Sequence, residues 1–136
     1  MKSLESGESI SKNIIAKEFW NHTGIKLEAG NTYSFEIIPK EQVWSDGKLA
    51  PQVTDADGFE NPLINVFNSL KRMRGEKWFA LIGCIDEKES TFFKIGNSCP
   101  EYKPSETGEL VCFANDADEH YKNNRGVMML TIKRIS

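Results

Sequence analysis

The sequence predicts a single all-β domain, an antiparallel β-sandwich, and two observations support this. Short runs rich in β-branched and aromatic residues recur about every 8–12 residues, with turn-forming residues between them. The run over residues 32–38 also alternates apolar and polar side chains, as a half-buried strand does. At 136 residues the chain is long enough to bury a core without disulfides or a structural metal.

Local composition predicts each element in turn. Residues 1–10 are rich in Ser, Glu and Gly and predict a flexible tail, so we expect the domain over residues 11–136. Residues 39–62 hold three of the five prolines and predict a long polar loop. Apolar residues at helical spacing predict a short amphipathic helix over 63–73. Strands are expected over 20–25, 32–38, 78–85, 91–96, 108–113 and 126–135.

Charge and hydropathy exclude several functional classes. The net charge is −3, so the chain has no basic field for nucleic acid or for an anionic membrane surface. No apolar run approaches the roughly 20 residues that a membrane-spanning helix needs. The N-terminal residues lack the apolar core of a signal peptide, which predicts a cytoplasmic protein or one released by a route without a signal peptide.

Neither cysteine chemistry nor a hydrolase motif is predicted. The three cysteines are widely spaced and form no C-x-x-C pair, so a disulfide framework or a zinc site is not expected. Cys84 and Cys112 lie in apolar runs and are expected in the core. No serine stands in a G-x-S-x-G motif, and we therefore predict a protein that is not an enzyme.

The most informative segment is the loop at residues 114–126. It holds three acidic and three amide side chains and ends in a glycine: Asn115, Asp116, Asp118, Glu119, Asn123, Asn124 and Gly126. A turn needs only one or two such oxygens. Because Ca²⁺ takes about 6–8 oxygen ligands from carboxylates, amides and backbone carbonyls, this surplus favours a calcium site.

The order of these residues resembles the PA-IL-like (LecA-like) bacterial calcium-dependent galactose-binding lectin family. The resemblance extends beyond one loop. Residues 20–33 (WNHTGIKLEAGNTY) are similar to the opening strands of that family, and residues 80–85 with 93–98 (FKIGNS) are similar to its central strands. Asn115-Asp116 followed by Asn123-Asn124-x-Gly matches its calcium loop in residue type and spacing.

The resemblance implies a β-sandwich lectin with one bound Ca²⁺ that shares its coordination with sugar hydroxyls. Asp116, Asn123 and Asn124 would supply side-chain oxygens, and His120 and Asp46 backbone carbonyls. The carbohydrate partner implied is a galactoside or a related glycan, and lectins of this kind commonly form homo-oligomers.

The sugar-reading residues depart from the family pattern. The His-Pro-x-Gln-Gly segment has no counterpart, and the nearest stretch is residues 54–58 (TDADG). We therefore predict a changed set of sugar contacts, in which Asp57 replaces the missing acceptors and Trp44 stacks on a sugar face. The predicted sugar-binding residues are Asp116, Ala117, Asn123, Asp57 and Trp44.

Other interpretations remain open at this level. The 115–126 loop could be an Asx-rich turn without a metal. The domain could be an intracellular interaction module on the same fold, which the missing His and Gln and the helix over 63–73 favour. A glycosidase-like pair such as Asp116 with Asp118 is a third and weaker interpretation.

Overall fold

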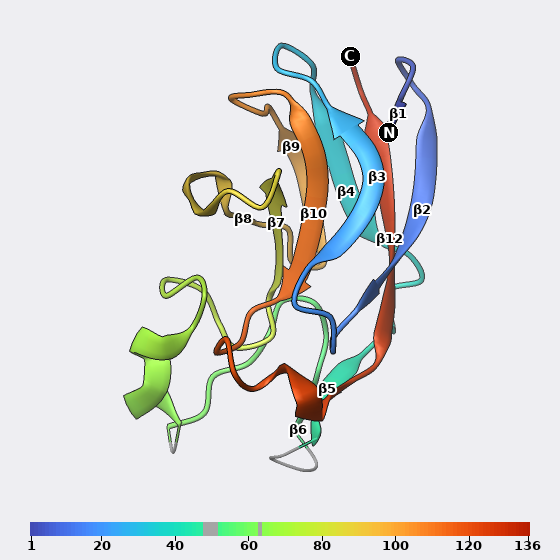
Figure 1. The fold of residues 1–136 in the computed structure, drawn as a ribbon. Helices are drawn as coiled ribbons and strands as arrows, with labels where there is room; N and C mark the ends of the chain where they lie inside the picture. Colours follow the sequence, from blue (N-terminus) through green and yellow to red (C-terminus); the bar gives the residue numbers. More distant parts are fainter. Residues whose placement is uncertain (48–51, 63) are drawn as a thin grey trace.

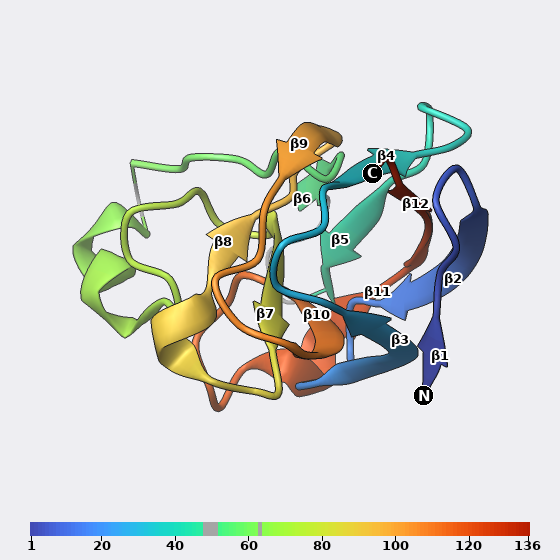
Figure 2. The same ribbon diagram turned by 90° about the horizontal axis from the view of Figure 1, so that it is seen from above.

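The computed structural model describes residues 1–47, 52–62 and 64–136 as an all-β sandwich, which confirms the predicted fold class. One sheet has five strands in the order β1-β3-β10-β7-β8, and the facing sheet has four in the order β2-β12-β4-β9. The two layers lie on either side of the core when viewed from above (Figure 2). A third, three-stranded sheet, β11-β5-β6, lies at one end (Figure 1).

Except for β1, the strands of the five-stranded sheet overlap the apolar runs predicted as strands. Its strands are β1 (Lys2–Ser3), β3 (Asn21–Leu27), β7 (Leu81–Ile85), β8 (Phe93–Lys94) and β10 (Gly108–Ala114). Along β3 every second residue is buried, so a period of two places one face in the core. Every residue of β7 is buried, because both of its faces are covered.

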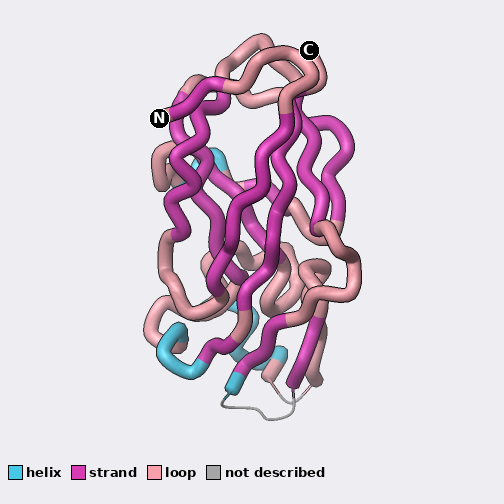
Figure 3. The backbone as a smooth tube through the Cα atoms, turned by 90° about the vertical axis from the view of Figure 1, so that its right-hand side faces the viewer, coloured by secondary structure: helices cyan, strands magenta, loops and turns pink. Residues whose placement is uncertain are grey.

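The four-stranded sheet brings together the two ends of the chain. Its strands are β2 (Ser9–Ile15), β4 (Tyr33–Ile37), β9 (Ser98–Tyr102) and β12 (Val127–Arg134). Met128, Leu130 and Ile132 of β12 point into the core, while their neighbours face outward. Both termini lie at one end of the sandwich, and the third sheet lies at the other (Figure 3).

The structure corrects the expected tail over residues 1–10. Strand β1 pairs in parallel with β3, Leu4 is buried in the core, and β2 pairs with β12 along seven residues. Composition alone did not predict this, because β2 has a polar outer face and pairs with a strand about 120 residues away.

Two further predictions differ from the structure: the loop predicted over 39–62 contains strands, and the helix predicted over 63–73 is a short 3-10 helix. Strands β5 (Trp44–Asp46) and β6 (Gln52–Thr54) lie inside the predicted loop, whose residues 48–51 are outside the described part of the chain. The predicted helix is a 3-10 helix, η2 (Asn65–Leu70), and residue 63 is outside the described residues. Two further 3-10 turns, η3 (Glu89–Thr91) and η4 (Tyr121–Asn123), and strand β11 (Asn124–Arg125) complete the chain.

A second, smaller apolar cluster covers the outer face of the five-stranded sheet. Ala80, Ile82 and Phe113 form its buried centre, and Trp20, Met73 and Phe92 pack against them. None of the helices in the described residues is long and apolar enough to cross a bilayer.

Candidate functional site

Asn115, directly after β10, holds two loops together at the end of the sandwich. Its side chain is fully buried, and its Nδ2 donates to the carbonyl oxygens of Met73 (2.9 Å), Lys77 (3.0 Å) and Glu76 (3.3 Å). Its Oδ1 accepts a hydrogen bond from the backbone N–H of Met73 at 3.0 Å. Every polar atom of this side chain is therefore used to tie the 73–77 segment to the end of β10.

Asp116 comes next and has a buried oxygen without a partner. The residue is 4% exposed, and its Oδ1 accepts a hydrogen bond from the backbone N–H of Ala117 at 2.8 Å. Its Oδ2 is buried and has no hydrogen-bond partner within the described structure. A buried carboxylate oxygen without a partner is costly, so a cation or a donor is the group that this position lacks.

Asn124, in β11, has a second such oxygen. It is 2% exposed, and its Nδ2 donates to the carbonyl oxygen of Ala16 at 3.1 Å, which orients the amide. Its Oδ1 is buried and, like Asp116 Oδ2, has no partner in the part of the chain that the structure describes. The Asn124 Nδ2 group also lies near Asp116 and, as an N–H donor, favours the ionised form of that carboxyl, so the effect leaves Asn124 Oδ1 without a partner. Two neighbouring side chains thus each present an unsatisfied acceptor oxygen.

The charges around Asp116 are adverse in the protein alone. Burial is the main cause that raises the pKa of the Asp116 carboxyl to about 6, and the Asp46 carboxylate contributes to the rise, whereas the Ala117 N–H, Asn124 and His120 act against it. Asp46 is close because β5 pairs with β11 in a register that sets Asp46 opposite Asn124. A bound cation would reverse this adverse field.

A cavity of about 310 Å³ opens beside these residues. On one side it is lined by Asp46, Asp116, Ala117 and His120. The opposite wall is apolar and comes from the 64–78 segment: Ile64, Phe67, Leu70 and Trp78. Phe67 and Leu70 are 51% and 54% exposed, so this wall reaches the surface. The cavity therefore pairs an acidic, oxygen-rich side with an apolar one.

The structure brings together most of the predicted metal residues. Asp46, Asp116 and His120 line the cavity together with Ala117, and Asn124 is buried against Asp116. Asn123 lies in η4, one residue before Asn124, and is exposed. Its side chain is not among those lining the cavity.

The structure corrects one predicted sugar contact, Trp44, whereas the contact of Asp57 stays a prediction. Trp44 is 1% exposed in the core, where its Nε1 donates to the carbonyl oxygen of Phe79 at 3.0 Å, so its ring cannot stack on a sugar. Asp57 faces another part of the protein: its Oδ1 accepts from the backbone N–H of Asn97 at 2.8 Å and lies 3.9 Å from Lys94 Nζ. It does not line the cavity.

The donor set at the cavity fits a hard cation such as calcium. Carboxylate, amide and carbonyl oxygens are the ligands that Ca²⁺ takes, and two carboxylates leave room for neutral oxygens. Over the described residues, no three His, Cys, Asp or Glu side chains gather closely enough to hold a metal. A site built here would depend on amide and backbone oxygens, with Asp46 and Asp116 as its acidic members.

Comparisons with known proteins identify the fold. No protein-family model matches the sequence, and no curated protein matches it. Among solved structures, the N-terminal domain of EclA, described as a PllA-like lectin, superposes with a TM-score of 0.67 at 20% sequence identity. The match covers 91% of this chain and 94% of that one. This chain has a PA-IL-like lectin fold. The fold that the loop and strand motifs implied is thereby confirmed.

The sequence analysis missed the residues that complete the cavity. Its apolar wall is formed by Ile64, Phe67, Leu70 and Trp78, although the 63–73 segment was predicted only as a helix and residue 78 only as the start of a strand. The available signal was that Phe67 and Leu70 stand among polar residues in a segment predicted to be amphipathic.

Proposed function

We propose that this protein is a non-catalytic, calcium-dependent lectin that binds a galactoside-type glycan. The observation that carries the proposal is the pair of buried, unpartnered oxygens, Asp116 Oδ2 and Asn124 Oδ1, beside an open cavity. A cation there would satisfy both oxygens and offset the repulsion between Asp116 and Asp46. The fold shared with the PllA-like lectin domain supports carbohydrate as the ligand class.

In this proposal, Asp116 and Asn124 bind the calcium ion through side-chain oxygens. The Asn123 side chain and the backbone carbonyls of His120 and Asp46 are the further ligands that the resemblance to the lectin loop implies. Ca²⁺ accepts a flexible coordination of about 7–8 oxygens, so sugar hydroxyls can replace water there at modest cost. Asp116 would also accept hydrogen bonds from those hydroxyls, and charge-assisted bonds are the stronger class. Ala117 borders the same cavity and would contact the sugar.

Binding at a single site of this size is expected to be weak. A cavity of about 310 Å³ holds little of a glycan, and the gain must exceed the cost of ordering the ligand. Homo-oligomers would raise the avidity without any new contact.

A second function is favoured by one observation. The half-exposed Phe67 and Leu70 give the cavity an apolar wall of the kind that a protein partner would cover. Under this alternative the domain is an interaction module that has kept the fold and lost sugar recognition.

Thermal unfolding in EDTA and in millimolar calcium tests the metal. At a calcium concentration of 100 times Kd, binding adds about 2.7 kcal/mol to the free energy of unfolding. For a domain of this size we expect Tm to rise by roughly 10 °C. Asp116→Asn should abolish the rise, whereas Glu119→Gln, an exposed acid in the same loop, should keep it. No rise for the unmodified protein would rule out calcium.

A glycan array in calcium then separates the two functions. Binding to galactose-terminated glycans that EDTA removes supports the lectin. A calcium-dependent Tm together with a blank array favours the interaction module.

A further inference from the structure

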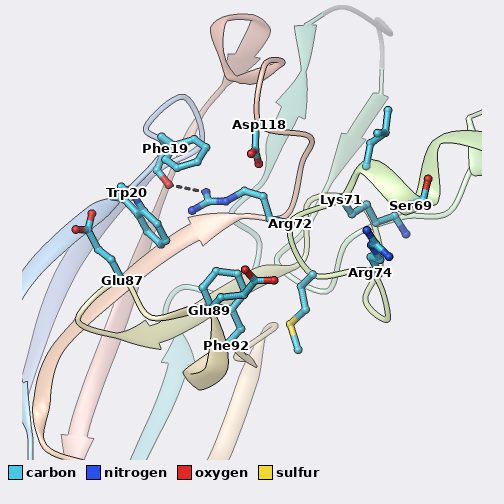
Figure 4. A pocket seen from close by; sticks show the side chains of 12 residues that line it. Phe19, Trp20, Ser69, Lys71, Arg72, Arg74, Glu87, Glu89, Phe92 and Asp118 are labelled. Carbon is cyan, nitrogen blue, oxygen red and sulfur yellow. Dashed lines mark hydrogen bonds between the residues drawn. The ribbon is translucent and has the colours of Figure 1, made fainter.

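A second and larger hollow lies next to the cavity, on the outer face of the five-stranded sheet. We call it the aromatic groove: it has a volume of about 880 Å³ and runs between the 69–74 segment and the 87–92 turn. Figure 4 shows Trp20, Phe92 and Arg72 at its centre, with Glu87 and Asp118 near its rim. The metal and sugar ligands predicted from the sequence do not line it, and of the acidic pair Asp116 and Asp118 only Asp118 does.

Arg72 ties together the side chains at the centre of the aromatic groove. The Arg72 guanidinium lies 3.7 Å from the ring centroid of Phe19 and 3.6 Å from that of Phe113, with Trp20 at 4.2 Å. Its Nη1 also donates to the carbonyl oxygen of Phe19 at 2.6 Å and to the Tyr121 hydroxyl at 3.0 Å. A guanidinium stacked and hydrogen-bonded in this way holds its neighbours in place before any ligand arrives.

The charges that line the aromatic groove point to a neutral ligand. Three are positive, Lys71, Arg72 and Arg74, and three are negative, Glu87, Glu89 and Asp118. The formal charge of the lining is therefore zero, which disfavours a polyanion such as nucleic acid or a sulfated glycan. The lining also contains three aromatic residues, Phe19, Trp20 and Phe92. Alternating polar groups and apolar faces are what neutral sugar rings present.

The aromatic groove and the cavity adjoin each other. Leu70 lines both, and it is 54% exposed. Lys71, which lines the aromatic groove, forms a β-bridge with Ala117, which lines the cavity. Asp116 and Ala117 border the cavity, and Asp118 borders the aromatic groove, so three consecutive residues pass from one to the other.

From this continuity we infer that the aromatic groove binds the inner sugar units of a neutral oligosaccharide whose terminal sugar occupies the cavity. The inference rests on the proposed lectin function and adds the ligand class: an uncharged chain of several sugars. The terminal sugar is held through its hydroxyls, and the following units cross Leu70 and lie against the aromatic side chains of the groove.

Titration calorimetry in calcium tests this with two probes, methyl β-galactoside and the neutral tetrasaccharide lacto-N-neotetraose, which ends in a β-galactose. We expect the tetrasaccharide to bind at least roughly tenfold more tightly, the equivalent of one well-made aromatic contact. Ser69→Trp, at an exposed position lining the aromatic groove, should remove this advantage and leave methyl β-galactoside binding unchanged. Ser105→Trp is the matched control, because Ser105 is exposed and does not line the groove.

The outcomes separate this inference from the proposed function. If the two probes bind the unmodified protein with equal affinity, or if Ser69→Trp still binds the tetrasaccharide more tightly to the same extent, the aromatic groove does not bind sugar units. The proposed lectin function stands in either case. No binding of either probe overturns both. A sialylated form of the tetrasaccharide that binds more tightly than the neutral one overturns the assignment to neutral chains. Trp20→Ala provides a second variant, and its tetrasaccharide affinity should fall to that of Ser69→Trp.

Discussion

Replacing Asp116 with Asn should stabilise the calcium-free protein at neutral pH, although it removes a proposed ligand. Burial and the nearby Asp46 raise the pKa of Asp116 from its ordinary value of 3.8 to about 6. Each pKa unit corresponds to about 1.36 kcal/mol, so ionising Asp116 costs the folded protein about 3 kcal/mol at pH 7. The amide is neutral and still offers an oxygen to the Ala117 N–H, so the variant avoids this cost.

Because the pKa of Asp116 is raised in the folded protein, the difference in stability between Asp116→Asn and the original protein should depend on pH. Below about pH 4, Asp116 is protonated in both the folded and the unfolded state, so the two proteins should be equally stable with respect to this group. Between about pH 4 and 6 the unfolded state loses the proton while the folded state keeps it, and the original protein loses stability. Above the folded pKa of about 6 the difference levels off at about 3 kcal/mol in favour of Asp116→Asn.

The assay is urea unfolding in EDTA at pH 4 and pH 7.5, followed by circular dichroism. The quantity compared is the difference in free energy of unfolding between Asp116→Asn and the original protein at each pH. Glu119→Gln is the control, and it should show no gain at pH 7.5. Equal stabilities of Asp116→Asn and the original protein at pH 7.5 would refute the account of Asp116 as a buried carboxylate without a charge partner.

Three further predictions concern the scaffold around the site. Asn115→Asp should lower the free energy of unfolding by about 3 kcal/mol or more, because a carboxylate cannot donate to the three carbonyl oxygens that the amide now satisfies. Thermal unfolding measures this loss, with the exposed Asn13→Asp as the control. Equal losses of stability in the two variants would contradict the prediction. Arg72→Lys should lower the free energy of unfolding by about 1–2 kcal/mol, since an ammonium cannot stack between two rings and form hydrogen bonds as the guanidinium does. Urea unfolding compares this variant with the exposed Arg74→Lys, whose stability should equal that of the original protein. Burial raises the pKa of the Cys84 thiol to about 12 and that of the Cys112 thiol well above its usual value. Alkylation at pH 8 should therefore leave both cysteines unmodified until urea unfolds the protein. Mass spectrometry of the alkylated, folded protein checks this, and an alkyl group on either cysteine would contradict the prediction.

The strands that form the core could be predicted from the sequence because their signal is local. β4 and β12 alternate buried and exposed residues, and β7 is a continuous apolar run. The strand β2 could not be predicted in the same way. Its alternation is weak, because Lys12 stands between the apolar residues of its inner face, and its partner β12 lies at the other end of the chain.

The sequence predicted only part of the site, because only some of the site residues lie close together in the chain. Asp116, Asn124 and His120 belong to one loop, so motif spacing could group them. The orientation of Trp44 depends on a hydrogen bond to Phe79, 35 residues away, and Asp57 is directed by Asn97. Such long-range contacts leave no trace in the local pattern, and the burial of Trp44 rules out its predicted sugar contact.

The sequence by itself determined the all-β class, the strands with a clear period of two, and the loop rich in oxygen donors, because each depends on neighbours in the chain. Only the tertiary structure decided which of those oxygens are buried without partners and which wall faces them. It also revealed the aromatic groove, whose Phe19, Arg72 and Phe92 come from three distant segments. Burial and charge balance are properties of assembled surfaces, and they exist only once the two sheets have packed.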